Sequence, residues 1–83
     1  MAKTVYKLIK TFNGKETFSK IYEDKDEAYK QYDELEFQAI LDASDTEFYE
    51  VNRDIKHEYF DIISYNEDKE YNHIIKLEEI NLV

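Results

Sequence analysis

The chain has 83 residues, no cysteine, no proline and a single glycine, and its 20 acidic and 11 basic side chains give a net charge of −9. This length suits one domain, residues 1–83, and the lack of cysteine excludes disulfides and thiolate ligands. The aromatic content of 16% argues against an acidic disordered tail. We expect a reducing, cytoplasmic setting, with neither a signal peptide nor a membrane span, because no apolar run is long enough.

The first predicted element is a β-hairpin. Residues 4–12 and 15–22 are rich in strand-forming types, and Asn13-Gly14 between them is the strongest two-residue turn signal. A plain two-residue turn sets apolar side chains opposite each other on the two strands. The predicted pairs are Ile9 with Phe18 and Val5 with Tyr22.

A helix is predicted after the hairpin. Asp24 can cap its first turn, and Glu27, three residues on, completes a capping box. Phe37 and Leu41 fall among charged residues on the side that should be exposed. The opposite side carries an apolar stripe at helical spacing, which should pack on the sheet, and this stripe consists of Ala28, Tyr32, Leu35, Ala39 and Ala43.

The segment 45–55 allows two interpretations. A second capping box, Ser44 with Glu47, favours a short helix there, whereas 59–65 has strand-forming residues and is followed by a polar turn at 66–70. We therefore predict a small α+β domain of order ββ-α-ββ. It has an N-terminal hairpin, a central helix and a C-terminal hairpin, with a second short helix or an irregular piece near 45–55.

No metal or cofactor site is predicted. The two histidines, His57 and His73, are sixteen positions apart, whereas a zinc site needs three or four ligands with a close pair. Asp42 opens a segment with the spacing of the first ligands of a calcium loop, but Glu47 stands where that loop needs glycine.

Enzymatic activity is not predicted either. The single glycine excludes a glycine-rich phosphate loop, and no serine has the flanking glycines of a nucleophile elbow. A pair of carboxylates in a cleft is the one catalytic arrangement that an acidic chain keeps open.

Direct binding of nucleic acid is disfavoured by charge. Residues 1–30 carry seven lysines and five acids, whereas residues 31–83 carry four basic residues and fifteen acids. We interpret the hairpin lysines as a solvated face, since the overall field repels phosphates. The acidic part of the chain should attract basic protein surfaces.

Acids with apolar residues between them form the predicted partner-binding surface. Carboxylates one helical turn apart lie about 5–6 Å from each other, which is comparable to the spacing of successive phosphates along a strand. A protein groove that holds phosphates could accept such a row, and exposed apolar side chains would anchor it. The predicted residues are Asp33, Glu34, Phe37, Leu41, Asp42, Asp45, Glu47, Glu50 and Asp54.

In size, charge, aromatic content and lack of cysteine, the chain resembles the small acidic inhibitors that phages make against host nucleic-acid enzymes, such as anti-CRISPR proteins and DNA mimics. The resemblance rests on these overall properties and transfers no site residue. It implies a non-enzymatic inhibitor in the host cytoplasm that blocks the basic nucleic-acid-binding cleft of a protein partner, with no cofactor and no direct contact to nucleic acid or membrane.

Two alternatives stay open. The first is a structural or assembly protein that forms a homodimer through the apolar pair Phe37 and Leu41 or through an open hairpin edge. The second is a small soluble domain of another kind, including a small enzyme with a carboxylate site.

Overall fold

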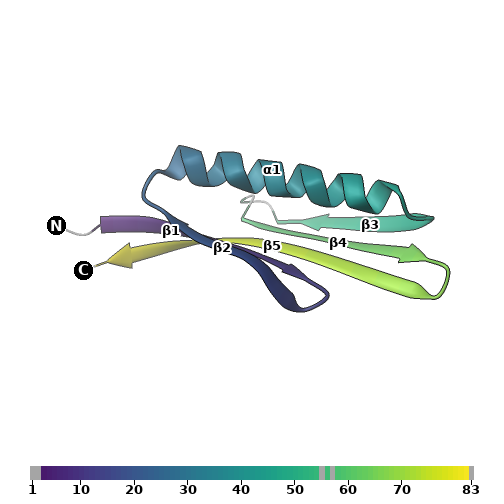
Figure 1. Cartoon of the computed structure of the whole chain (residues 1–83). Helices are drawn as coiled ribbons and strands as arrows, with labels where there is room; N and C mark the ends of the chain where they lie inside the picture. The colour runs from purple at the N-terminus through teal and green to yellow at the C-terminus, as the bar shows by residue number, and fades with distance from the viewer. Residues whose placement is uncertain (1–2, 55, 57, 83) are drawn as a thin grey trace.

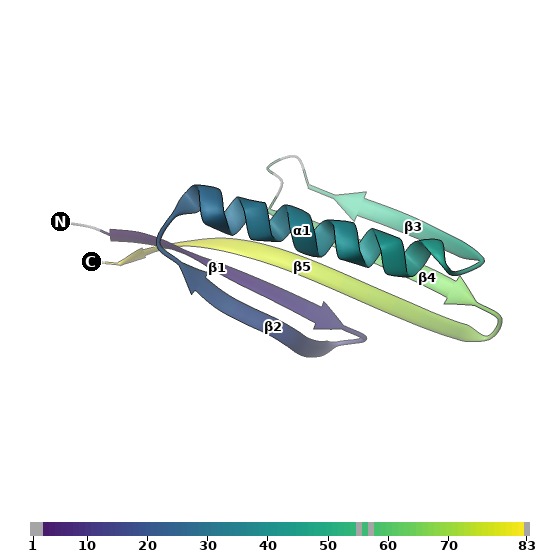
Figure 2. The ribbon, with the colours of Figure 1, turned by 45° about the horizontal axis from the view of Figure 1, so that its top comes forward.

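The computed structural model describes residues 3–54, 56 and 58–82, which form a five-stranded antiparallel sheet with one helix along one of its faces (Figure 1). The strand order is β2-β1-β5-β4-β3, so β2 and β3 are the edges of the sheet (Figure 2). Within the described residues, no helix is long and apolar enough to cross a membrane. The elements in chain order are β1 (Lys3–Phe12), β2 (Lys15–Tyr22), α1 (Lys25–Ser44), β3 (Phe48–Arg53), β4 (Tyr59–Asn66) and β5 (Lys69–Leu82).

The predicted ββ-α-ββ order is wrong, because a fifth strand follows the helix. Phe48–Arg53 form β3, where a short helix or an irregular piece was predicted, and this strand pairs antiparallel with β4. The backbone N–H of Glu47 already donates to the carbonyl of Tyr65, 3.1 Å away, and leads the chain into the sheet. Pairing with β4 satisfies the backbone groups that the two strands turn toward each other, a gain that the local helical pattern does not reveal.

The predicted second capping box does not form. Ser44 is the last residue of α1, and its hydroxyl donates to the carbonyl of Leu41, 2.7 Å away. The hydroxyl of Thr46 donates to the carbonyl of Ala43. Both hydroxyls therefore satisfy carbonyls in the last turn of α1, and the chain leaves the helix at that point.

The turn of the N-terminal hairpin forms as predicted. Asn13 and Gly14 both have positive φ, 52° and 83°, which a type I′ turn requires. The side-chain oxygen of Asn13 also accepts the backbone N–H of Asn72, 2.8 Å away, and so ties this turn to β5.

The predicted register of the hairpin is wrong beyond this turn. A bulge between Lys10 and Thr11 shifts the pairing by one residue, so that Phe18 lies opposite Lys10 and Tyr22 lies opposite Tyr6. A slip of one residue moves side chains to the other face of a strand. The bulge therefore puts Phe18 and Tyr22 on the helix side of the sheet, where they join the core. The predicted pairs of Ile9 with Phe18 and Val5 with Tyr22 do not form.

The helix follows the sequence closely. Asp24 is its N-cap, and its carboxylate accepts the backbone N–H of Asp26 rather than that of Glu27. Three small alanines on its inner side allow close packing on the sheet, while Leu35 is half-buried. The buried helix residues are Ala28, Tyr32, Glu36, Ala39 and Ala43. The core side chains of the covered sheet face pack against them: Leu8, Tyr22, Phe60, Ile62, Ile75 and Leu77. Burying a large apolar side chain completely contributes about 1.5–3 kcal/mol.

No described element covers the other face of the sheet. Successive side chains along a strand point to opposite faces of the sheet, so the residues next to core positions point to this uncovered face. Val5 is nearly buried among its neighbours, whereas Ile21 is 59% exposed. The apolar residues of this face, which we call the open sheet face, are Val5, Ile9, Ile21, Phe48, Ile63, Tyr65, Ile74, Ile80 and Leu82.

Candidate partner-binding surface

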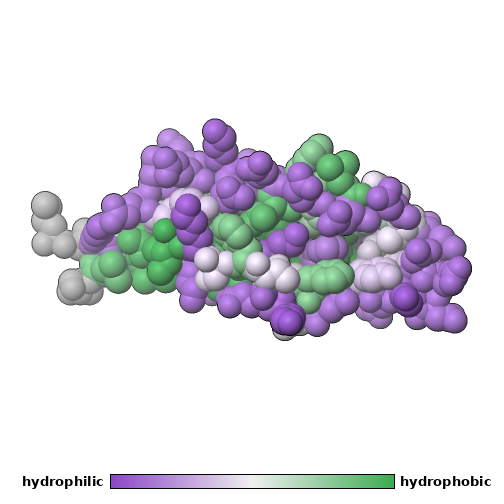
Figure 3. All heavy atoms as spheres, in the orientation of Figure 1, coloured by the Kyte–Doolittle hydropathy of each residue, from purple (hydrophilic) through white to green (hydrophobic). Residues whose placement is uncertain are grey.

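The solvent side of α1 combines carboxylates with two exposed apolar side chains. Phe37 is 58% exposed and Leu41 is 44% exposed, although both lie on a helix that packs well on its other side. Figure 3 shows an apolar patch that interrupts the hydrophilic surface over the C-terminal half of the helix. The helix carries five exposed acids and two exposed lysines, which makes its outer side negative: Asp26, Glu27, Asp33, Glu34 and Asp42 with Lys25 and Lys30.

Six of the nine predicted partner-binding residues lie together along this helix and its C-cap, and all six are exposed. Glu47 follows two residues beyond the C-cap and is exposed, where the chain turns from the helix into the sheet. We call the six residues the helix surface: Asp33, Glu34, Phe37, Leu41, Asp42 and Asp45.

The other two predicted residues, Glu50 and Asp54, do not continue the row. Glu50 pairs with Ile63 and lies on the open sheet face, because its neighbour Val51 pairs with the buried Ile62. The carboxylate of Asp54 accepts the backbone N–H groups of residues 58 and 59 at 2.8 and 3.1 Å. Asp54 therefore shapes the connection between β3 and β4.

Glu36 is an acid that faces the core, a position that was not predicted from the sequence. Its side chain is 10% exposed and forms an ion pair with Arg53 of β3, whose guanidinium also lies 5.5 Å from the ring centroid of Phe60. The helical spacing indicates this position, because Glu36 stands four residues after the buried Tyr32 and so lies on the same side of the helix. The ion-pair partner of Glu36 could not be predicted, because Arg53 was not expected to lie on a strand.

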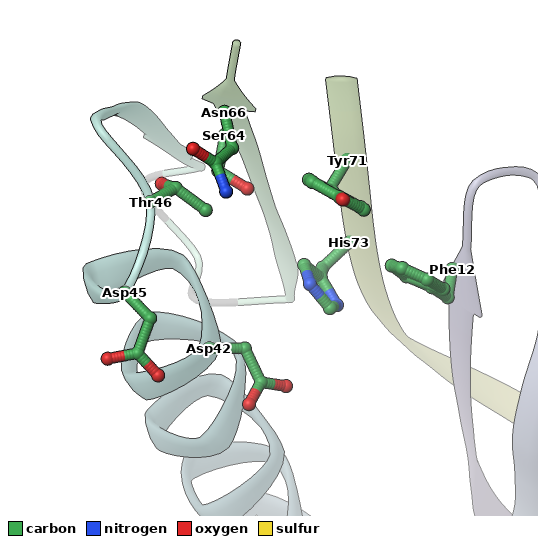
Figure 4. A pocket seen from close by; sticks show the side chains of 8 residues that line it. All are labelled: Phe12, Asp42, Asp45, Thr46, Ser64, Asn66, Tyr71 and His73. Atoms are coloured by element: carbon green, nitrogen blue, oxygen red, sulfur yellow. The ribbon is translucent and has the colours of Figure 1, made fainter. Parts of the chain in front are cut away.

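A hollow of about 280 Å³ lies where the C-terminal end of α1 meets the sheet. Figure 4 shows the two acids on one side of it and three rings on the other. Asp42 and Asp45 were predicted to belong to a partner-binding surface, but their proximity to the strand residues was not predicted. The lining residues are Phe12, Asp42, Asp45, Thr46, Ser64, Asn66, Tyr71 and His73.

Three rings form one wall of the hollow. The ring of Phe12 is nearly parallel to that of Tyr71, at 8°, with their centroids 6.2 Å apart. The imidazole of His73 lies 4.7 Å from the Phe12 ring, measured between centroids. β1 and β5 therefore hold these side chains in a fixed arrangement through their pairing.

His73 is the buried titratable group of this hollow. It is 6% exposed, and its Nδ1 has no hydrogen-bond partner among the described residues. Burial lowers the pKa of His73, and the charge of Lys10 lowers it further, while Asp42 acts in the opposite direction. The lowered pKa favours the neutral form of the imidazole.

A second depression, of about 340 Å³, lies between the N-terminal half of α1 and β2. It contains both signs of charge, since Lys20 and Lys30 line it together with Glu27 and Glu34. The ammonium group of Lys20 also lies 4.9 Å from the ring centroid of Tyr22. The ammonium groups of Lys20 and Lys30 therefore balance the two carboxylates of this depression.

Metal binding finds no support in the geometry. Among the residues that the structure describes, no three histidine, aspartate or glutamate side chains are grouped so that they could hold an ion. The side chains of the helix surface and of the hollow offer charge, hydrogen bonds and apolar contact.

No family model, curated protein or solved structure matches this chain.

Proposed function

We propose that this chain is a non-enzymatic acidic protein that binds the basic nucleic-acid-binding surface of a partner protein. The helix surface is the observation that carries the proposal. It places four carboxylates and two exposed apolar side chains between residue 33 of α1 and the C-cap at residue 45, a helical length of about 18 Å. A phage-encoded inhibitor of a host defence or nucleic-acid enzyme, of the anti-CRISPR kind, would use such a surface.

Charge and apolar contact have separate roles in this proposal. The net charge of −9 speeds the encounter with a basic surface and makes binding sensitive to salt. Phe37 and Leu41 would be the desolvated anchors, because a few buried apolar contacts carry most of the binding free energy of an interface.

Capture from a bacterial lysate, followed by competition, tests the proposal. The immobilised chain should retain a nucleic-acid-binding protein at about 50 mM salt and lose most of it at about 300 mM, because screening weakens the attraction. An added DNA duplex or RNA should displace the same protein, since it would compete for one cleft. Capture that resists both salt and nucleic acid would contradict the proposal.

A matched pair of variants locates the surface. Asp33→Asn with Glu34→Gln removes two charges from the helix surface and should weaken capture. Glu78→Gln with Glu79→Gln removes two exposed charges from the far end of β5 and should weaken it much less. Equal weakening would mean that net charge alone, and no particular surface, drives the association.

Self-association is a second candidate function, favoured by the open sheet face. The exposed apolar side chains at its two ends, Ile21 and Phe48, could be covered by a second copy of the chain. Repulsion between two copies of charge −9 is screened by salt, so a homodimer should become tighter as salt rises. Size-exclusion chromatography with light scattering at low and high salt separates the two candidates by the sign of the salt effect.

A further inference from the structure

We propose that the hollow at the C-terminal end of α1 binds the guanidinium group of one arginine side chain. The proposed function supplies the source of that side chain, which is the basic surface of the protein partner. The preference of the hollow for a guanidinium group depends only on the residues that line it.

The charge of the hollow calls for a cation. Asp42 and Asp45 line it, and the last turn of α1 contains no basic residue. The C-terminal end of a helix also carries a partial negative charge. Within the described chain, no lysine or arginine lines the hollow or forms an ion pair with either acid.

The hydrogen-bonding groups of the hollow call for donors on the ligand. The two carboxylates accept only, and the side-chain oxygen of Asn66 can accept as well. The hydroxyl of Thr46 donates a hydrogen bond to the carbonyl of Ala43, so the lone pairs of the hydroxyl oxygen remain available to accept from a ligand. A guanidinium fits this set because it brings five N–H donors and no acceptor.

His73 is independent evidence for a ligand. Its side chain is buried, lines the hollow and leaves Nδ1 without a hydrogen-bond partner in the described residues. A neutral imidazole offers one acceptor nitrogen, and buried polar atoms are nearly always hydrogen-bonded in native proteins. A donor from a bound side chain would supply the missing partner.

The shape of the hollow selects arginine. Its volume of about 280 Å³ is below the range of about 300–1,000 Å³ that is usual for whole small-molecule ligands, so one side chain suits it better than a nucleotide. The wall of Phe12, Tyr71 and His73 is aromatic. A planar guanidinium can lie parallel to an aromatic ring and combine stacking with charge, whereas the compact ammonium of lysine offers only a point charge over the ring.

Titration of the full, ¹⁵N-labelled chain by NMR tests the proposal without any partner. The probes are N-acetyl-arginine methylamide, its lysine counterpart and its citrulline counterpart, which keeps the planar shape and loses the charge. We expect saturable shifts that centre on the lining residues, with a dissociation constant on the order of 1 mM for the arginine probe. The lysine probe should bind more weakly, and the citrulline probe weakest of all.

Variants locate the binding. Asp42→Asn with Asp45→Asn should raise the dissociation constant at least fivefold, and Asp42→Asn alone should raise it by less. Glu78→Gln with Glu79→Gln makes the same change in net charge at the other end of the sheet and should leave the constant unchanged. Melting curves confirm that each variant is folded, and the single variant keeps the test informative should the double variant unfold.

Three outcomes would overturn the proposal: no saturable shifts, equal binding of citrulline and arginine, or equal effects of the two double variants. Micromolar binding of the isolated arginine probe would also overturn it, since the ligand would then be a free guanidinium compound. Because the titration contains no partner protein, a negative titration would contradict the guanidinium site and would not contradict the proposed function, which the salt-sensitive capture tests. A negative capture experiment, in turn, would contradict the proposed function and would not change the result of the titration.

Discussion

One pair of an aromatic residue and an acid lies on each side of α1, and the two pairs differ in what surrounds them. Each side has an aromatic residue and an acid close together, Tyr32 with Glu36 on the inner side and Phe37 with Glu34 on the outer side. The inner pair is buried and the outer pair is exposed. The same chemical groups should therefore govern stability on one side and association on the other, because only burial removes them from water.

The aromatic residues give the largest expected contrast. Tyr32 is the largest fully buried side chain, and Tyr32→Ala should lower the free energy of unfolding by about 3–5 kcal/mol, through lost burial and a cavity. Phe37→Ala on the outer side should change it by less than about 0.5 kcal/mol. Urea unfolding followed by circular dichroism measures both, and similar losses would contradict the assignment of the two sides.

The acids give the next contrast. Arg53→Ala removes the charged partner of the nearly buried Glu36 carboxylate and should cost about 1–3 kcal/mol of unfolding free energy. The outer control Glu34→Gln should cost less than about 0.5 kcal/mol. In a Glu36→Gln background the cost of Arg53→Ala should shrink, and an unchanged cost would mean that Arg53 stabilises the fold mainly through packing on Phe60.

His73 gives a smaller, pH-dependent contrast. Its folded-state pKa is lowered by burial and by Lys10, and is opposed by Asp42, so the unfolded chain takes up a proton first as the pH falls. The contribution of the neutral His73 to the free energy of unfolding is fully present above the unfolded-state pKa of about 6.5. It is lost as the pH falls through that value toward the folded-state pKa. His73→Gln should therefore lose less stability than the wild type between pH 7.5 and 5.5. Parallel pH dependences in urea unfolding would contradict this coupling.

The outer apolar pair should have the smallest effect on folding and a large effect on binding. Phe37→Ala with Leu41→Ala should leave the melting curve nearly unchanged and weaken partner capture about tenfold or more. Ile21→Ala is the matched control, because Ile21 is as exposed as Phe37 and lies on the open sheet face. Loss of capture in the control instead would move the binding site to that face.

The candidate site could be predicted only where it lies on one helix. The spacing of Asp33, Phe37 and Leu41 around a 3.6-residue turn was enough to expect them on the solvent side, and all three are exposed there. Glu50 could not be placed in this way. Its side depends on the pairing of β3 with β4, and β3 was not predicted as a strand.

The hollow lay beyond sequence reasoning for the same reason. Phe12, Asp42 and His73 are 30 or more positions apart, and they meet only because β5 pairs with β1 under the end of α1. No local pattern marks such a meeting, since none of these residues contacts another within its own element.

The sequence by itself determined the Asn13-Gly14 turn, the start of α1 at Asp24 and the exposed side of that helix. These features depend on backbone preferences and contacts within a few residues. Only the tertiary structure decided that 48–53 is a strand and that a bulge turns Phe18 and Tyr22 toward α1. Both outcomes depend on distant segments, because a strand is stabilised by backbone hydrogen bonds to its neighbour and by the core that the whole sheet shares with the helix.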